Sequence, residues 1–412
     1  MDITITPKKL SGPITPPPSK SQAHRLIITA CLGAGVSRIS NLKFSQDIRA
    51  TLFCMEQLGA RWEQTGGDTI QIAGIGAGKS KSDSRLPRFD CGESGSTLRF
   101  LIPIALAVAG GGVFTGRGRL MERPQQPYFD LFDEKGIFYE QRDGVLTVRG
   151  ELTPGDYALP GNVSSQFFTG LLCALPLLDG PSRIYPTTAL ESWDYIAMTM
   201  DALMGAGVVV TEPHGESGCF HVSPQAYSPI DRAVEADWSQ AGFYYAANGL
   251  GNSVKILGMN AGSVQGDKII CPYYARLCGG GPVELDVSQC PDLVPPLALH
   301  AALRAGESTR LVGAARLRIK ESDRLATVTS ELRRLGADIE EGPDFLSIRG
   351  IAALTGGDTD SHNDHRIAMM LAMAATRTSG SVTIRDAGAV AKSYPDFWSD
   401  YARLGGVFTR TE

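Results

Sequence analysis

The sequence predicts a mixed α/β (α+β) fold made from six copies of one small α/β unit. Two patterns recur out of phase along the chain. In one, a helical segment ends at a glycine before two strands, and in the other, a polar cluster opens an apolar helix. The repeat is roughly 70 residues long, which exceeds the common solenoid periods. We therefore expect each copy to be a subdomain with one buried and one outer helix.

The glycine-terminated helices are the first pattern. A glycine just past the last helical residue is the usual left-handed cap, and strand pairs are expected after it. Residues 61–64 and 69–72 form one predicted pair, and residues 339–341 and 345–348 form another. The helix ends lie at residues 54–60, 199–206 and 330–337, and weaker ones lie at Gly136, Gly279 and Gly405.

The polar helix openings are the second pattern. The helices after them, such as residues 100–106 and 367–373, are apolar on most sides, which predicts buried helices. Helix N-termini carry partial positive charge and free N–H groups, so several at one surface would attract an anion. The six openings are residues 19–25, 92–99, 163–166, 237–240, 290–292 and 361–366.

The length of the chain bears on its domain organisation. With 412 residues, 43% of them hydrophobic, the chain can bury more than one core. Six copies could stack as one array or divide three and three, and size favours two lobes. We expect an N-terminal lobe at residues 17–233 and a C-terminal lobe at residues 1–16 and 234–412, which includes the first strand. The chain would cross between them at a double hinge near residues 12–18 and 228–236.

Composition narrows the classes of function. A net charge of −5 argues against a nucleic acid or an anionic membrane surface as the partner. The eight cysteines include no CxxC pair, which is typical of reduced, buried thiols. The longest apolar run, residues 101–109, is too short to span a bilayer, and the first residues do not resemble a secretory leader. We therefore expect a cytoplasmic protein whose cationic clusters bind small anions.

The most charged stretch is residues 318–324, where three cations surround two carboxylates. If this stretch runs into a helix, Lys320, Glu321 and Arg324 share one face. Two fixed cations beside a carboxylate suit a polyanionic substrate that also needs a proton moved. The alternative is a solvated helix with internal ion pairs.

Other polar groups also have a structural and a functional interpretation. Ser21 is the expected N-cap of the first buried helix, and Asp292 and Asp364 are expected N-caps of later ones. Gly95 would let backbone N–H groups approach a ligand. The glycine-rich stretch at residues 74–80 looks like a P-loop, but its first required glycine is missing and no apolar helix follows, so a plain loop is expected.

Together these groups resemble the 3-phosphoshikimate 1-carboxyvinyltransferase family, the EPSP synthases. The resemblance covers nearly the whole chain and rests on six pieces in the family order, not on any single one. The pieces are Ser-Lys-Ser at residues 19–21 with Arg25, Glu-Arg-Pro at 122–124, Ser-Ser-Gln at 164–166, Lys-Glu-Ser-Asp-Arg at 320–324, Asn-Asp-His-Arg at 363–366 and Ala-Lys-Ser-Tyr-Pro-Asp at 391–396.

The resemblance implies a fold and an activity. The fold would be two lobes of three similar subdomains each, of the inside-out α/β barrel type, with the active site in the interlobe cleft. The activity would be transfer of the enolpyruvyl group of phosphoenolpyruvate to the 5-hydroxyl group of shikimate 3-phosphate. These small molecules would be the partners of a monomer, with no cofactor, no nucleic acid and no membrane involved.

The resemblance also implies the roles of individual residues. Asp292 would be the base for the 5-hydroxyl group, Glu321 would protonate the methylene carbon, and Lys20 would share the proton transfer. The residues that would hold shikimate 3-phosphate are Lys20, Ser21, Arg25, Ser164, Ser165, Gln166, Ser192, Asp292 and Lys320. The residues that would hold phosphoenolpyruvate are Lys20, Gly95, Arg123, Gln166, Arg324, Arg366 and Lys392.

The residue types suit these substrates. The two molecules bring roughly five negative charges at neutral pH, and seven of the nominated residues are lysine or arginine. Arginine forks match phosphate and carboxylate oxygens. No metal is implied, because the acidic residues have cationic neighbours and no pair of histidines has ligand spacing. Arg316 stands where many family members have a shikimate-contacting Asn, so it is left out of the predicted site.

Two rival functions remain open. The sister enzyme that transfers enolpyruvyl to UDP-N-acetylglucosamine shares the fold but usually has a reactive cysteine near residues 117–123, where this chain has none. The other rival is a non-catalytic phosphosugar-binding protein on the same scaffold. Loss of Asp292 or Glu321 would favour it, and both residues are present.

Overall fold

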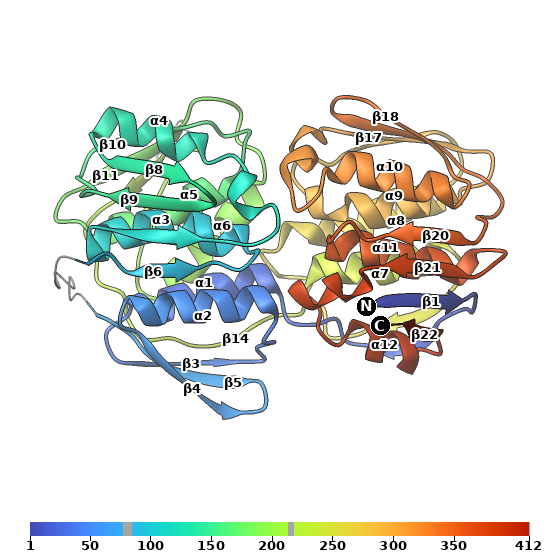
Figure 1. Cartoon of the computed structure of the whole chain (residues 1–412), viewed down its shortest axis with the longest axis horizontal. Helices are drawn as coiled ribbons and strands as arrows, with labels where there is room; N and C mark the ends of the chain where they lie inside the picture. The colour runs from blue at the N-terminus through green and yellow to red at the C-terminus, as the bar shows by residue number, and fades with distance from the viewer. Residues whose placement is uncertain (77–84, 213–217, 412) are drawn as a thin grey trace. The chain divides into compact units, whose positions relative to one another are not determined.

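The computed structural model describes residues 1–76, 85–212 and 218–411 of the chain. The chain forms two compact units, which Figure 1 colours along the sequence. Unit 1 comprises Met1–Pro17 and Ala236–Glu412, and unit 2 comprises Pro18–Glu235. The stretch at residues 74–80 extends beyond the described residues, so its interpretation as a plain loop stays a prediction. The double hinge also stays a prediction.

Unit 2 has inner and outer helices, as the two sequence patterns predict. The inner helices bury nearly every side chain, because a helix that is apolar on all sides is stable only inside a core. They are α1 (Lys20–Leu32), α3 (Gly95–Ala109) and α5 (Ser165–Ala174). The outer helices are α2 (Gln46–Gln57), α4 (Gln126–Lys135) and α6 (Trp193–Gly205), and short 3-10 turns are η1 (Leu120–Glu122) and η2 (Leu175–Leu177).

The sheets in the described part of unit 2 share one strand order. In each sheet the first two strands are parallel and the next two pairings are antiparallel. The first sheet is β14 (Asp231–Ala233), β3 (Val36–Ser40), β5 (Thr69–Ala73) and β4 (Arg61–Gly66). The second is β6 (Arg88–Asp90), β7 (Gly111–Thr115), β9 (Val145–Arg149) and β8 (Phe138–Arg142). The third is β10 (Asp156–Leu159), β11 (Ser182–Pro186), β13 (Phe220–Val222) and β12 (Val210–Thr211).

Unit 1 repeats the same two helix sets. Its inner helices are α7 (Trp238–Gly249), α9 (Val294–Ala302) and α11 (His365–Ala374). Its outer helices are α8 (Ile270–Cys278), α10 (Arg324–Arg334) and α12 (Phe397–Arg403). Its 3-10 turns are η3 (Gly266–Ile269), η4 (Pro291–Leu293), η5 (Ala315–Ile319), η6 (Ala375–Arg377) and η7 (Ala387–Lys392).

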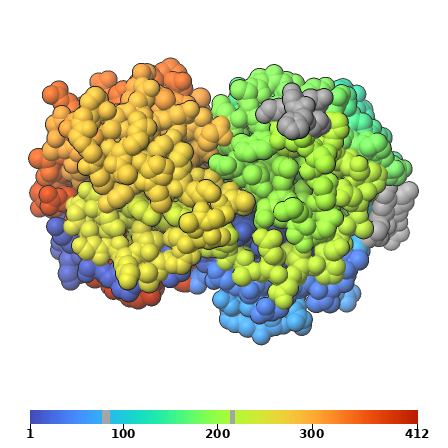
Figure 2. All heavy atoms as spheres, turned by 180° about the vertical axis from the view of Figure 1, so that it is seen from behind, coloured from blue at the N-terminus to red at the C-terminus, as the bar shows by residue number. Residues whose placement is uncertain are grey.

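The sheets of unit 1 combine both ends of the chain. One sheet is β16 (Val283–Asp286), β17 (Ser308–Val312), β19 (Phe345–Arg349) and β18 (Asp338–Glu341). Another is β20 (Gly357–Asp360), β21 (Val382–Arg385), β1 (Asp2–Thr6) and β22 (Val407–Thr411), so the first strand of the chain completes the last repeat (Figure 1). The third is the parallel pair of β2 (Ser11–Ile14) and β15 (Ser253–Ile256), and Figure 2 shows the dark-blue N-terminal segment beside the yellow surface of this region.

The connections place the N-termini of inner helices at the ends of strands. Helices α3, α5, α9 and α11 each join two parallel strands of one sheet, so each begins just after the carboxyl end of a strand. Ligands of α/β folds bind at this edge. Each unit has its own hydrophobic core, formed largely by its inner helices. The cores thus fix where the polar helix starts lie.

Two details of the predicted repeat were wrong. Gly205 is the last residue of α6, and Gly279, which follows α8, is extended. The left-handed glycines lie two residues further on, at Gly207 and Gly281, because the chain turns only after one more residue in each case. The other glycine-terminated helices end at left-handed glycines as predicted: Gly59, Gly136, Gly336 and Gly405.

The thiol of Cys278 is exposed and that of Cys271 half-buried, so not every cysteine is buried. Within the described ranges, no helix is long and apolar enough to cross a membrane.

Candidate functional site

Unit 2 presents three capped helix N-termini. The side chains of Ser19, Ser94 and Ser164 accept hydrogen bonds from backbone N–H groups of α1, α3 and α5 at 3.1–3.4 Å. Ser19 therefore holds the cap position expected for Ser21, whereas Lys20 and Ser21 are the first two residues of α1. Each cap accepts from one of the free N–H groups of the first helical turn, and the helix dipole still favours an anion in front of that turn.

Lys20 has a carboxylate partner that sequence reasoning missed. Its Nζ lies 2.8 Å from Oδ2 of Asp47 in α2, and both side chains are mostly buried. The pair anchors the ammonium group at the start of α1. The two residues are 27 positions apart on different helices, and no sequence pattern connects them.

Arg25 is more deeply built into the protein than its predicted role requires. The residue is 2% exposed and donates to Oγ1 of Thr199 and Thr169 and to the carbonyl groups of Ser21 and Tyr195. Burial lowers the pKa of Arg25 to about 10, which leaves it charged at neutral pH. The guanidinium group ties α1 to α5 and α6. Its contact with a substrate phosphate stays a prediction.

A chain of buried hydrogen bonds connects α1 to the cap of α3. Nδ1 of His24 lies 2.7 Å from Oγ1 of Thr51, which lies 2.7 Å from Oγ1 of Thr97, and that hydroxyl group donates to Oγ of Ser94 at 2.8 Å. Burial, together with two nearby cations, holds the pKa of His24 well below its usual value. The imidazole is therefore neutral, and the chain fixes the relative positions of the two helix starts.

Gln166, at the start of α5, is held at both ends of its amide group. Its Oε1 accepts from Nη1 of Arg99 at 2.9 Å, and its Nε2 donates to Oγ of Ser96 at 3.0 Å. Arg99 also donates to the carbonyl group of Pro124 at 2.9 Å and lies over the ring of Phe167. Sequence reasoning missed Arg99, and the available signal was one arginine inside the apolar helix α3.

Gly95 and Arg123 are in direct contact. A Cβ atom at position 95 would lie 2.5 Å from Nη1 of Arg123, so only glycine leaves room for this guanidinium group. Arg123 is 8% exposed, and its Nε is buried without a hydrogen-bond partner among the described residues. None of the ion pairs in the described part of the chain involves this side chain. A buried cation in this condition is suited to an anionic ligand.

Arg324 is the centre of the predicted site residues in unit 1. Its side chain is 1% exposed and contacts three carboxylates: Oδ1 of Asp292 at 3.0 Å, Oε2 of Glu321 at 2.5 Å and Oδ2 of Asp364 at 2.9 Å. Burial opposes its charge, but Asp364, Glu321 and Asp292 outweigh burial and raise the pKa of Arg324 above its usual value. Asp364 was expected only as an N-cap. It is the N-cap of α11, and it binds this arginine as well.

Asp292 lies between two arginines. Its Oδ1 accepts from Arg324 and its Oδ2 accepts from Nη2 of Arg366 at 2.6 Å. Burial opposes ionisation, but Arg366, Lys320 and Arg324 together hold the pKa of Asp292 well below its usual range, against repulsion from Glu321. Asp292 lies inside η4 and caps no helix, so the expected cap was wrong. The residue is ionised and, while both arginines hold it, a weak base.

The charged stretch at residues 318–324 does not form the single helix that was expected, because residues 320–323 lie between η5 and α10. Helix α10 begins only at Arg324, and Lys320 has extended backbone after η5. Glu321 reaches Arg324 from a bend instead of from the same helix face. Arg318 binds the carboxylate of Asp323, which caps α10, so this part of the stretch is structural.

Lys320 titrates close to neutral pH. Burial lowers its pKa to about 7, with Arg316 and Arg324 acting in the same direction and with Asp292 and Glu321 opposing them. Such a lysine can be neutral or charged in the physiological range. An arriving phosphate would favour the charged form.

Lys392 and Arg366 are the remaining predicted cations of the candidate site in unit 1. Nζ of Lys392 donates to the carbonyl group of Asn363 at 2.6 Å, and the residue is 4% exposed. Nη2 of Arg366 also donates to Oγ of Ser239 at 3.2 Å, and its backbone N–H donates to the side chain of Asp364. The Asn363–Asp364 turn therefore links Lys392, Arg366 and Arg324.

The structure distributes the predicted residues over both units. Unit 2 contains Lys20, Ser21, Arg25, Gly95, Arg123, Ser164, Ser165, Gln166 and Ser192. Unit 1 contains Asp292, Lys320, Glu321, Arg324, Arg366 and Lys392. In unit 1 the contacts above join Asp292, Glu321, Arg324 and Arg366 into one cluster, which the Asn363–Asp364 turn links to Lys392. In unit 2 they gather around the helix starts, and Ser192 is a buried, left-handed residue just before α6.

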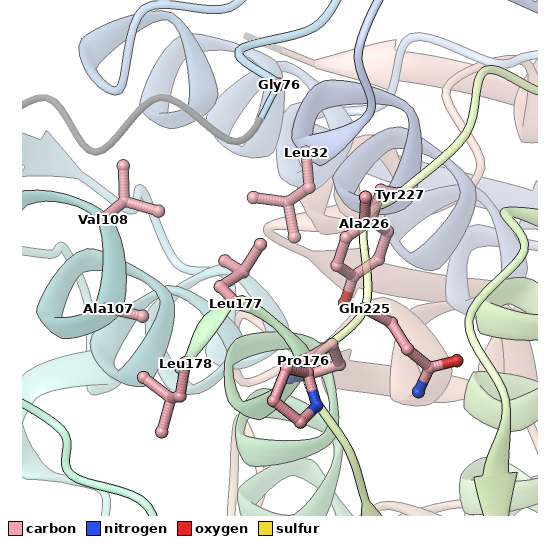
Figure 3. Close-up of a pocket in the computed structure, with 11 residues that line it drawn as sticks. Leu32, Gly76, Ala107, Val108, Pro176, Leu177, Leu178, Gln225, Ala226 and Tyr227 are labelled. Atoms are coloured by element: carbon pink, nitrogen blue, oxygen red, sulfur yellow. The ribbon is translucent and has the colours of Figure 1, made fainter. Parts of the chain in front are cut away.

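A separate cavity of about 310 Å³ lies elsewhere in unit 2 (Figure 3). Leu32, Val108 and Leu177, near the carboxyl ends of α1, α3 and α5, line it with Tyr227, and none of the predicted site residues does.

Over the described part of the chain, no group of three or more His, Cys, Asp or Glu residues could hold a metal ion.

Comparison with protein families finds one match over nearly the whole chain. The family model described as EPSP synthase (3-phosphoshikimate 1-carboxyvinyltransferase) matches residues 5–401. A 3-phosphoshikimate 1-carboxyvinyltransferase of Clostridium beijerinckii is 43% identical, over 99% of this chain and 98% of the relative. One of Clostridium perfringens is 44% identical, over 98% of both chains.

Solved structures show the same architecture. A structure of EPSP synthase from Acinetobacter baumannii aligns with a TM-score of 0.79 at 23% sequence identity. The alignment covers 99% of this chain and 100% of that chain. At this identity the likeness concerns the fold, and the fold predicted from the repeats is confirmed.

Proposed function

The chain belongs to the EPSP synthase family, and from this premise we propose that it transfers the enolpyruvyl group of phosphoenolpyruvate to the 5-hydroxyl group of shikimate 3-phosphate. The products are 5-enolpyruvylshikimate 3-phosphate and phosphate, in the shikimate pathway to the aromatic amino acids. One observation carries the chemistry: Arg324 holds Asp292 on Nη1 and Glu321 on Nη2. Two carboxylates on one buried cation provide a base and an acid within reach of one small substrate.

Asp292 and Glu321 divide the proton transfers between them. In the addition step, Asp292 takes the proton of the 5-hydroxyl group, whose oxygen bonds to C2 of phosphoenolpyruvate, and Glu321, which is protonated at the start of the step, gives its proton to the methylene carbon. In the elimination step, the new methyl group returns a proton to Glu321, the C2–O bond to phosphate breaks and the double bond re-forms. The proton on Asp292 passes to the departing phosphate.

The cations divide the negative charge of the substrates. In unit 1, Arg324, Arg366 and Lys392 hold phosphoenolpyruvate, and its carboxylate competes with Asp292 for the two arginines. Each arginine taken from Asp292 removes a cation that keeps this carboxylate weakly basic. Substrate binding therefore strengthens the proposed base.

In unit 2, Arg123 lies against Gly95, and its Nε has no hydrogen-bond partner among the described residues. We assign it, with Lys20 and Gln166, to phosphoenolpyruvate. The hydroxyl-rich helix starts supply hydrogen bonds to the phosphate of the other substrate, because a capped N-terminus is suited to an anion. The residues assigned to shikimate 3-phosphate are Lys20, Ser21, Arg25, Ser164, Ser165, Gln166, Ser192, Asp292 and Lys320.

Residues from both units are assigned to each substrate, so both units must act on the same pair of substrates. We infer that the chain crossings near residues 12–18 and 228–236 serve as hinges that let the units close and exclude water. The protein is proposed to work as a monomer in the cytoplasm, without a cofactor.

The deciding experiment measures phosphate release from phosphoenolpyruvate with and without shikimate 3-phosphate. Release only in its presence is expected, and UDP-N-acetylglucosamine in its place should give none. Release with the nucleotide sugar alone would favour the sister enzyme. Binding of shikimate 3-phosphate without any turnover would favour a non-catalytic phosphosugar-binding protein.

A further inference from the structure

The turn before α11 has an unfavourable backbone. His362 and Asn363 are consecutive non-glycine residues with φ angles of 52° and 54°, in the left-handed region. Residues with a Cβ atom adopt this region at a cost, so two in succession persist only where other contacts hold them.

Glu331 in α10 supplies contacts that hold the turn. Its side chain is 1% exposed and accepts from Nε2 of His362 at 2.9 Å and from the backbone N–H of Asp360 at 2.9 Å. Ser330 and Arg334 donate to the same carboxylate, at 3.1 and 3.3 Å. The imidazole of His362 is 38% exposed, so its bond to Glu331 joins a surface side chain to a buried anchor.

The other end of the turn belongs to the cation cluster of unit 1. The carbonyl group of Asn363 accepts from Lys392, and Asp364 binds Arg324, caps α11 and accepts from Oγ of Ser322 at 3.0 Å. Arg324 and Glu331 are seven residues apart in α10, so they project from the same face two turns apart. Side chains of one helix, α10, thus contact both ends of the turn.

We propose that Glu331 and His362 are positioning residues for phosphoenolpyruvate, which act through this turn on Lys392, Arg324 and Arg366. The proposal rests on the function proposed above. Neither side chain touches the reacting atoms. Their effect is to hold the Asn363 carbonyl group, which accepts from Lys392, and the Asp364 carboxylate, which accepts from Arg324 and from the backbone N–H of Arg366.

The test compares steady-state kinetics of His362→Ala, His362→Gln and wild-type protein. We expect His362→Ala to raise the KM for phosphoenolpyruvate about 5- to 10-fold, with the KM for shikimate 3-phosphate within about 2-fold of wild type. His362→Gln keeps an N–H donor near the position of Nε2 and should restore most of the affinity. Arg385→Ala removes an exposed side chain next to the turn and is the matched control.

The outcomes separate this proposal from the proposed function. Wild-type protein without shikimate 3-phosphate-dependent phosphate release would overturn the function itself. An active wild type with an unchanged KM for phosphoenolpyruvate in His362→Ala would overturn only the positioning role. An equal rise in both KM values together with a lowered melting temperature would also overturn the positioning role, because that pattern indicates general destabilisation. Glu331→Gln, which removes the buried charge, should raise the same single KM if it folds.

Discussion

The guanidinium group of Arg324 forms an ion pair with Asp292, with Nη1 3.0 Å from Oδ1, and the arginine side chain is 1% exposed. Arg366 holds the other oxygen of the same carboxylate at 2.6 Å. The proposed base is thus paired with the two arginines assigned to the carboxylate of phosphoenolpyruvate. The first prediction tests that base.

Replacing Asp292 with Ala should lower kcat by roughly 10²–10⁴, the usual contribution of a general base. Binding of shikimate 3-phosphate should persist, because the phosphate-binding residues remain. Isothermal titration and turnover assays separate the two effects. Glu284→Ala, an exposed acidic change in β16, is the control. Turnover close to that of wild type would remove Asp292 from its proposed role.

Gly95→Ala should weaken phosphoenolpyruvate binding several-fold. The added Cβ atom would lie 2.5 Å from Nη1 of Arg123, so the guanidinium group must shift away from its present position. Gly67→Ala is a matched control, since a Cβ atom there meets nothing within 4 Å. The KM for phosphoenolpyruvate is the measurement. Equal KM values in the two variants would contradict the assignment of Arg123 to this substrate.

Binding of shikimate 3-phosphate at pH 8 should take up protons. Lys320 has a pKa of about 7, so at pH 8 it is mostly neutral, and a bound phosphate would raise this pKa and protonate it. Calorimetric titrations in two buffers of different ionisation enthalpy measure the uptake. Lys320→Met should abolish the part that belongs to this residue, and an undiminished uptake in that variant would refute the assignment.

The same lysine gives a pH dependence of stability. The unfolded chain holds a proton on Lys320 up to about pH 10.5, whereas the folded protein loses it above about pH 7. Between these values the unfolded state binds more protons, so the contribution of Lys320 to the free energy of unfolding rises with pH. Comparing denaturant midpoints of wild type and Lys320→Met at pH 6.5 and 9 isolates it. Lys320→Met should exceed wild type in free energy of unfolding by less at pH 9 than at pH 6.5. A difference in stability that grows with pH would contradict the direction argued above.

Arg25→Met should lower the stability of the protein as well as its affinity for shikimate 3-phosphate. Arg25 donates to four buried or half-buried oxygen atoms, and removing it leaves several without a donor. A loss of roughly 2–4 kcal/mol in the free energy of unfolding is expected. Arg38→Met removes an exposed ion pair and should cost little. Loss of affinity with full stability would show that Arg25 serves the ligand alone.

Local patterns in the sequence were sufficient for the repeat and for part of the site. Glycine stops such as Gly136 and polar helix openings such as Ser164 act within a few residues, so they are visible without a structure. The charged stretch at residues 318–324 shows the limit of this approach. Its spacing suggested one helix face, but Asp323 caps α10 and places Lys320 and Glu321 outside the helix.

The sequence by itself determined the repeated α/β units, the buried helices and the cationic residue types of the candidate site. Only the tertiary structure decided their partners: Asp47 beside Lys20, Arg99 on Gln166, and Asp364 on Arg324. The physical reason is range. Caps and periodicity depend on neighbours one or two turns away, whereas these pairs join separate helices whose approach is set by the packing of the core.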